Sequence, residues 1–203
     1  MSSQSDTQTL RHLQSENIRL RAENNSMRNY VERLQRTLSA LVDLQKSIDM
    51  VNRETNIFLL IHHLVEAALM AVDSEDGSLM LLDEDTGELV FVEVIGEAQA
   101  RLVNRRLPRD AGIAGWVMDN RQPKLIPELA AHPQLRLSVN HYTGMDAKTM
   151  CCVPLLDGDR RLGVIEVINS SSGRLFEHSD LDILQIVARL ASLAIIEAEK
   201  ASA

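Results

Sequence analysis

The stretch TMCCVPLLDGDRRLGVIEVIN, residues 149–169, decides the fold. It holds two apolar runs, 149–156 and 162–169, separated by Asp157-Gly158-Asp159. Two apolar runs of strand length joined by a short turn of Asp and Gly predict a β-hairpin. Because neighbouring side chains on a strand point to opposite faces, the adjacent Cys151 and Cys152 are poorly placed to form a disulfide with each other.

A second hairpin is predicted upstream, where Ser78–Leu82 and Leu89–Ile95 flank the turn sequence 83–87. Alternation along the second of these strands predicts two faces. One face carries Val90, Val92 and Val94, and the other carries Leu89, Phe91, Glu93 and Ile95.

Helical patterns enclose the two hairpins. Before the first hairpin, a dense apolar pattern starts at Ile57, with Thr55 or Asn56 as its N-cap. After the second, Ser179 is expected to cap a last helix, with Asp182 completing a capping box. The middle segment, 107–147, predicts a short helix near 112–117 with Asp110 as candidate cap, a short strand at 124–126, and a helix plus a loop over 130–147 without convincing periodicity. This order predicts an α+β fold, with a central antiparallel β-sheet flanked by helices.

A seven-residue apolar repeat precedes this domain. One series of positions is Leu13, Leu20, Met27, Leu34, Leu41 and Ile48, and the other includes Asn17, Asn24, Val31 and Leu38. These are the d and a positions of a coiled coil, and neither Gly nor Pro interrupts the chain before Gly77. The sequence therefore predicts a long N-terminal coiled-coil helix whose a and d residues form a dimer interface.

Polar residues on this helix predict a parallel homodimer. Asparagine at an a position pairs with its copy across two parallel strands and sets register and oligomer number. Glu16 and Glu23 occupy g positions, and Arg21 and Arg28 occupy the e positions five residues later, as interchain pairs in a parallel dimer require. The repeat degrades after Ile48, and we expect a break near 52–56. The predicted organisation is a disordered N-terminus over 1–8, a coiled coil over 9–52 and a sensor domain over 53–200.

Composition excludes several classes of function. The net charge of −8 disfavours nucleic acid, and only Arg11 and His12 stand where a DNA-binding zipper needs a basic region. No signal peptide and no apolar run of membrane-spanning length occurs, so we expect no membrane insertion. Two cysteines without a disulfide pattern indicate a cytoplasmic protein. Phosphate-binding, dinucleotide-binding and serine-hydrolase motifs are missing from the sequence, which predicts a chain that is not an enzyme.

The segment from about 55 to 197 resembles the GAF domain family. Six pieces carry the resemblance in order: 78–83 (SLMLLD), 112–117 (GIAGWV), Pro123 with 125–127 (LIP), 150–155 (MCCVPL), 162–169 (LGVIEVIN), and Phe176 with Asp180. The resemblance implies a signalling module that binds a small ligand between its sheet and its variable middle segment, and that dimerises through its terminal helices.

This placement of the pocket nominates seven ligand-binding residues: Phe91, Trp116, His141, Tyr142, Met150, Cys152 and Glu166. Glu166 stands out because its neighbours Ile165 and Val167 are apolar. The alternative for Glu166 is a solvent-facing position on an alternating strand. For Trp116 and Cys152 the alternative is ordinary core packing.

The resemblance leaves the ligand unknown. Cyclic-nucleotide-binding relatives share Asn169, Phe176 and Asp180, but Ser170 and Leu181 replace the lysine and glutamate of that motif. Bilin-binding relatives attach their chromophore through a cysteine in the middle segment, where this chain has only His141 and Tyr142. Haem and metal are disfavoured because the six histidines do not form a ligand pattern.

The sequence thus predicts a dimeric signal-transduction sensor or adaptor that binds a small ligand and relays it through the coiled coil to a downstream signalling protein. One alternative is a purely structural adaptor with a GAF fold and no ligand. The other is a thiol-based redox enzyme similar to free methionine sulfoxide reductases, which use several separated cysteines where this chain has one adjacent pair.

Overall fold

The computed structural model describes residues 2–49, 56–108 and 110–202. The chain divides into an N-terminal unit, residues 1–36, and a C-terminal unit, residues 37–203. In chain order the elements are α1 (Ser2–Asp49), α2 (Ile57–Val72), β1 (Asp76–Leu82), β2 (Leu89–Ile95), α3 (Gln99–Leu102), β3 (Arg106–Leu107), α4 (Gly112–Asn120), β4 (Lys124–Ile126), the 3-10 turn η1 (Leu129–Ala131), α5 (Pro133–Thr143), β5 (Met150–Asp157), β6 (Arg160–Ile168) and α6 (His178–Ser202).

The N-terminal unit is helical throughout its described length, as part of α1. This helix as described includes residues 2–8, the segment for which the sequence predicted disorder. The predicted d and a positions are exposed on the single chain, with Leu13 57%, Leu20 52%, Met27 64%, Val31 44%, Leu34 46% and Leu38 63% exposed; Asn17 and Asn24 are exposed too. On the described chain, α1 thus exposes a stripe of apolar side chains that two asparagines interrupt.

The last turns of α1 belong to the C-terminal unit, and one side of these turns is buried. Ala40 and Leu44 are buried in its core, Leu41 and Ile48 pack partly against that core, and the Thr37 hydroxyl donates to the Ala71 carbonyl at 2.9 Å. Leu41 and Ile48, predicted for the dimer interface, therefore also contact their own domain. The predicted break near 52–56 lies almost wholly outside the described residues, which resume at Asn56.

The described residues form a six-stranded antiparallel sheet in the order β3-β2-β1-β6-β5-β4. Both predicted hairpins are present, and β5 and β6 are joined through Gly158, whose φ of 55° suits a tight turn. Gly163 lies where β6 crosses β1 closely, since a Cβ there would overlap the Met80 carbonyl oxygen. The prediction of an α+β fold is confirmed.

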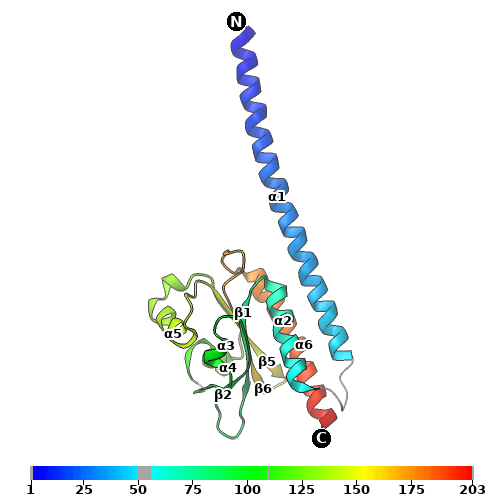
Figure 1. Cartoon of the computed structure of the whole chain (residues 1–203), viewed down its shortest axis with the longest axis vertical. Coiled ribbons are helices and arrows are strands. Elements are labelled where there is room, and N and C mark those ends of the chain that lie inside the picture. Colours follow the sequence, from blue (N-terminus) through cyan, green and yellow to red (C-terminus); the bar gives the residue numbers. More distant parts are fainter. Residues whose placement is uncertain (1, 50–55, 109, 203) are drawn as a thin grey trace. The chain divides into compact units, whose positions relative to one another are not determined.

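The sheet separates two apolar layers. Helices α2 and α6 lie side by side on one face, while α3, α4 and α5 lie over the other (Figure 1). Cys151 belongs to the α2/α6 layer and Cys152 to the opposite layer, as their adjacency on a strand requires. In the part of the chain that is described, no helix is both long enough and apolar enough to span a bilayer.

The ends of the two covering helices are set by side-chain caps. Asn56 accepts hydrogen bonds from the backbone amides of Phe58 and Leu59, which confirms one of the two predicted caps of α2. Helix α6 begins at His178, before the predicted cap Ser179. The carboxylate that accepts a backbone amide at the start of the helix is that of Asp180, not that of Asp182 as the predicted capping box required. Asp180 accepts from the Glu177 amide at 2.8 Å and binds the Arg174 guanidinium through both oxygens, at 2.6 and 2.7 Å.

Candidate functional site

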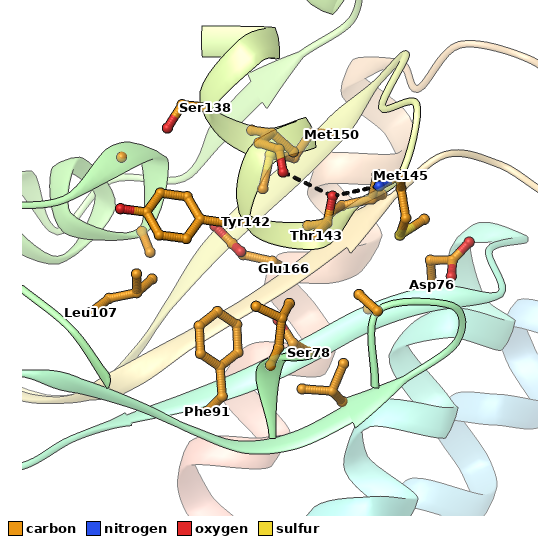
Figure 2. Close-up of a pocket in the computed structure, with 18 of the residues that line it drawn as sticks. Asp76, Ser78, Phe91, Leu107, Ser138, Tyr142, Thr143, Met145, Met150 and Glu166 are labelled. Carbon is orange, nitrogen blue, oxygen red and sulfur yellow. Dashed lines mark hydrogen bonds between the residues drawn. The ribbon is translucent and has the colours of Figure 1, made fainter. Parts of the chain in front are cut away.

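A partly enclosed cavity of about 70 Å³ lies on the face of the sheet away from α2 and α6. Its described lining consists of Asp76, Gly77, Ser78, Phe91, Val94, Ile95, Ala98, Leu102, Leu107, Ala111, Gly112, Ala114, Leu135, Ser138, Val139, Tyr142, Thr143, Met145, Met150, Glu166 and Ile168. Figure 2 shows Phe91 rising from the sheet and Tyr142 reaching in from α5 on the other side. The volume admits several water molecules, but it is below the several hundred Å³ of ligand pockets that hold drug-sized molecules.

The floor of the cavity is set by strand register. Ser78 of β1 and Cys152 of β5 both lie opposite Glu166 of β6, so the three residues share one face of the sheet. An irregularity in the β1–β2 pairing brings Phe91 and Val94 to this same layer, although they are three residues apart. The predicted alternation along 89–95 is therefore wrong beyond Phe91, because the bulge shifts the side-chain period by one residue.

Glu166 is the buried carboxyl of this floor, with only 8% of its surface exposed. Burial disfavours its charged form and raises the pKa of the carboxyl to about 7, while a hydrogen bond with the Cys152 thiol opposes the rise. Burial raises the pKa of Cys152 well above its ordinary value, and the nearby Glu166 charge and the same hydrogen bond raise it further. The alternative of a solvent-facing glutamate is therefore wrong.

Helix α5 forms the opposite wall and is held in place at both ends. Pro133 occupies its first turn, where the missing amide hydrogen does no harm, and Gly144 ends it with a φ of 78°. The Thr143 hydroxyl donates to the Val139 carbonyl at 2.8 Å and accepts from the Met145 amide at 3.1 Å (Figure 2). This bond pattern turns the chain after α5 back toward the sheet.

The loop between α5 and β5 is fixed by two asparagines. The Asn140 side chain accepts from the Ala147 amide at 3.0 Å, and the Asn169 side chain accepts from the Lys148 amide at 2.8 Å. An ion pair between Arg136 and Asp146 adds a contact on the exposed side. The wall and the floor of the cavity are thereby connected by several hydrogen bonds.

Four of the seven nominated residues line the cavity: Phe91, Tyr142, Met150 and Glu166. Cys152 lies beneath Glu166 as a fully buried contact of its carboxyl. Trp116 and His141 lie outside the lining. The side chain of Trp116 is 39% exposed under the Lys124 ammonium, 4.3 Å from the ring centre, and His141 is exposed beside Tyr142. Helix α4 turns Ile113, Ala114 and Val117 inward, which leaves Trp116 on its outer side.

Sequence reasoning missed most of the α5 contribution. Leu135, Ser138, Val139 and Tyr142 line the cavity at a spacing of i, i+3, i+4 and i+7, which is one face of a helix. The sequence contains this spacing, but Ser138 and Tyr142 interrupt its apolar pattern. Asp76 had no such signal, because its place at the cavity follows from where β1 begins.

The three residues shared with cyclic-nucleotide-binding relatives all have structural contacts. Asn169 holds the Lys148 amide, Phe176 is 1% exposed in the α2/α6 layer, and Asp180 binds Arg174. None of the three is among the described residues that line the cavity. Their match to that motif is therefore explained by folding.

Neither thiol has the surroundings of a reactive cysteine. Burial raises the pKa of Cys151 to about 12, and both cysteines are free and buried. A thiolate nucleophile needs a lowered pKa and access to its reactant. Across the described ranges, no three His, Cys, Asp or Glu side chains gather as a metal-binding group.

Comparison with known proteins identifies the domain. A family model described as GAF domain matches residues 60–196. The probable 3',5'-cyclic phosphodiesterase pde-5 of Caenorhabditis elegans is 30% identical over 176 residues, which cover 81% of this chain and 24% of that protein. The chain thus spans only about a quarter of this relative's length.

Two solved structures share the fold. The GAF domain of a phosphoenolpyruvate-protein phosphotransferase from Coxiella burnetii superposes with a TM-score of 0.68 at 17% identity, covering 82% of this chain and 96% of that one. The free methionine-R-sulfoxide reductase of Neisseria meningitidis does so with a TM-score of 0.65 at 18% identity, covering 81% and 91%. From the antiparallel sheet, the cavity between Glu166 and α5, and the matching family model, we conclude that this chain belongs to the GAF domain family.

Proposed function

We propose that this chain is a dimeric sensor without catalytic activity of its own, which binds a small ligand in the cavity and passes the binding event along α1 to a partner protein. The observation that carries the proposal is a cavity whose floor holds a buried carboxyl, Glu166, with an apolar wall around it. Burying an ionisable group in an apolar site is expensive for folding, so such a group marks a functional site.

A continuous set of contacts leads from the cavity to α1. Asp76 and Ser78 line the cavity from β1, which follows directly after α2. The Ala71 carbonyl near the end of α2 accepts the Thr37 hydroxyl, and Leu44 is buried in the same core. A ligand that shifts β1 therefore shifts the surface on which the last turns of α1 pack. The size of the effect is limited by the ligand's differential affinity for the two arrangements.

Dimerisation is proposed through the exposed stripe of α1. In a parallel pair, the a and d residues from Leu13 to Leu38 become the interface, and Glu16 and Glu23 face Arg21 and Arg28 of the partner subunit. Within one chain, Glu16 and Glu23 already lie 3.6 and 3.7 Å from Arg19, so the interchain pairs select orientation more than they add stability. The free buried thiols and the net charge of −8 support a cytoplasmic protein that does not bind nucleic acid.

The structural adaptor remains the second candidate, and the small volume of the cavity favours it. In this alternative the chain dimerises and holds a partner protein, and no ligand enters. The thiol redox enzyme is disfavoured by the burial and raised pKa of Cys151 and Cys152.

Two measurements on the full chain test the proposal. Sedimentation equilibrium is expected to give a dimer, and native mass spectrometry of the freshly purified chain is expected to show a bound small molecule that is lost on denaturation. A monomer would refute the relay along α1. A dimer whose mass is always that of the bare chain would favour the adaptor.

A further inference from the structure

We propose that the cavity selects a small cationic ligand, whose ammonium group donates hydrogen bonds to Glu166 and whose short apolar body packs against Phe91 and Met150. This inference rests on the proposed function and deepens it by naming the ligand class. The proposal predicts an amine and not an anionic ligand such as a cyclic phosphate.

The charges of the cavity carry the inference. Two of its described lining residues, Asp76 and Glu166, are acidic, and none of the described lining is Lys, Arg or His. Asp76 has a partner of its own, because it accepts the Glu97 amide at 2.8 Å. Glu166 is more than nine-tenths buried, and its side-chain partner is the Cys152 thiol. A thiol is a weak donor, so most of the capacity of the carboxylate to accept hydrogen bonds is open to a ligand.

Electrostatics favour a cation over a neutral molecule at this position. A buried carboxyl recovers its charged form when an opposite charge lies within about 4–6 Å. Among the described residues, the titratable groups that share the cavity lining with Glu166 are Asp76 from β1 and Tyr142 from α5, and Cys152 from β5 contacts its carboxyl. None of these three groups supplies a positive charge. Because the pKa of Glu166 is about 7 without a ligand, an amine would displace a proton from part of the molecules at neutral pH.

The rest of the lining sets the size and character of the ligand. Apart from Glu166 and Asp76, it consists largely of apolar side chains, with hydroxyls from Ser78, Ser138, Tyr142 and Thr143. The Thr143 hydroxyl is already engaged with Val139 and Met145. A volume of about 70 Å³ in a partly enclosed cavity favours a short ligand over one of the size of a nucleotide.

One feature opposes a cation. Helix α4 begins at the cavity with Ala111 and Gly112, and its N-cap, Ala111, makes no side-chain capping bond. The positive end of a helix attracts anions, and this attraction is confined to the first turn. Because this is less than the penalty for bringing a second negative charge beside a buried carboxylate, we expect an amine to prevail.

The test uses three probes that share one isopentyl body: isopentylamine, 3-methylbutan-1-ol and 4-methylpentanoate. The full chain, labelled with ¹³C in its methionine methyl groups, is titrated with each probe at pH 7.5 and followed by NMR. Met145 and Met150 report on the cavity, and the exposed Met70 serves as the internal control. The amine is expected to shift Met145 and Met150 with an affinity at least tenfold above that of the alcohol, and the carboxylate is expected to bind more weakly than either.

Two further measurements remove the alternatives. Glu166→Gln is expected to abolish the preference for the amine, while Glu93→Gln, which changes a carboxyl contacting His62 from the other side of the sheet, leaves it unchanged. If the Glu166→Gln chain does not fold, the unmodified chain still provides a test, because the amine affinity is expected to rise between pH 6 and pH 8 as Glu166 ionises.

The outcomes separate the two proposals. Equal or tighter binding of the carboxylate or the alcohol at Met145 and Met150 overturns the ligand class and leaves a ligand-binding sensor. No shift at these two methyl groups with any of the three probes, together with a bare mass in native mass spectrometry, overturns both.

Discussion

The two units of this chain differ in how far their apolar side chains are exposed. The N-terminal unit leaves Leu20, Met27 and Leu34 about half exposed or more, whereas in the C-terminal unit Leu64, Leu79 and Leu184 are fully buried. Each buried leucine contributes about 1.5–3 kcal/mol to folding, and an exposed one contributes nothing until another chain covers it. The C-terminal unit therefore has a buried core of its own, whereas the exposed leucines of the N-terminal unit would contribute to stability only in the proposed dimer.

The segment Thr37–Asp49 lies between these two behaviours. It continues the same helix, but Ala40 and Leu44 are buried against the domain while Leu38 stays 63% exposed. One side of these turns contacts the domain and the other is open to a partner. In the proposed function, these turns are the place where a change in the domain would reach the coiled coil.

The largest effect is expected from a charge placed on the exposed stripe. Leu20→Lys removes two buried leucines from each dimer, about 3–6 kcal/mol, and we expect dimerisation to weaken at least 100-fold in sedimentation equilibrium. Ile18→Lys is the matched control, because Ile18 is 70% exposed but lies off the a and d positions. Equal weakening by both variants would show that the stripe is not the interface.

The next effect concerns the C-terminal unit alone. Asp180→Asn leaves the part-buried Arg174 guanidinium without its bidentate partner, which is expected to reduce the free energy of unfolding by about 3–5 kcal/mol. Urea denaturation measures the loss, with the exposed Asp182→Asn as control. Dimerisation of the chain that remains folded is expected to be unchanged. A parallel loss of dimerisation would show that this ion pair also supports the dimer.

Glu166 predicts a pH dependence confined to the C-terminal unit. Its pKa is about 7 when folded and 4.5 in the unfolded chain, so between these values the folded state binds more protons and stability falls as pH rises. Relative to Glu166→Gln, the unmodified chain is expected to lose about 3 kcal/mol of stability between pH 4.5 and pH 8, measured by urea denaturation at several pH values. A constant difference across this range would mean that Glu166 titrates normally.

The smallest expected effect is on the packing of residues 37–49. Thr37→Val removes the hydroxyl that satisfies the Ala71 carbonyl, and we expect about 1–2 kcal/mol less stability for the packing of α1 on the domain. Faster hydrogen exchange of the amides in 37–49 would report this loss. Ser39→Ala, at an exposed position two residues away, is expected to leave the exchange unchanged.

Much of the fold was predictable because it follows from local chemistry. The hairpin strands 89–95, the short strand 124–126 and the Asn56 cap were all identified from neighbouring residues. The start of α6 at His178 was missed by two residues, because Asp180, which also binds Arg174, accepts the Glu177 amide in place of the predicted Ser179 cap. The candidate site was half predicted: Phe91, Tyr142, Met150 and Glu166 line the cavity, while Trp116 and His141 do not.

The sequence by itself determined the heptad repeat, the order of hairpins and helices, and the separation of Cys151 from Cys152 on opposite faces, since all three depend on periodicities of 3.5, 3.6 and 2 residues. Only the tertiary structure decided that Val94 joins Phe91 in the cavity layer, that Glu166 is buried beside Cys152, and that Leu44 packs on the domain. These outcomes depend on a bulge, on strand register and on helix packing. Residues far apart in the chain set all three, so no local pattern contains them.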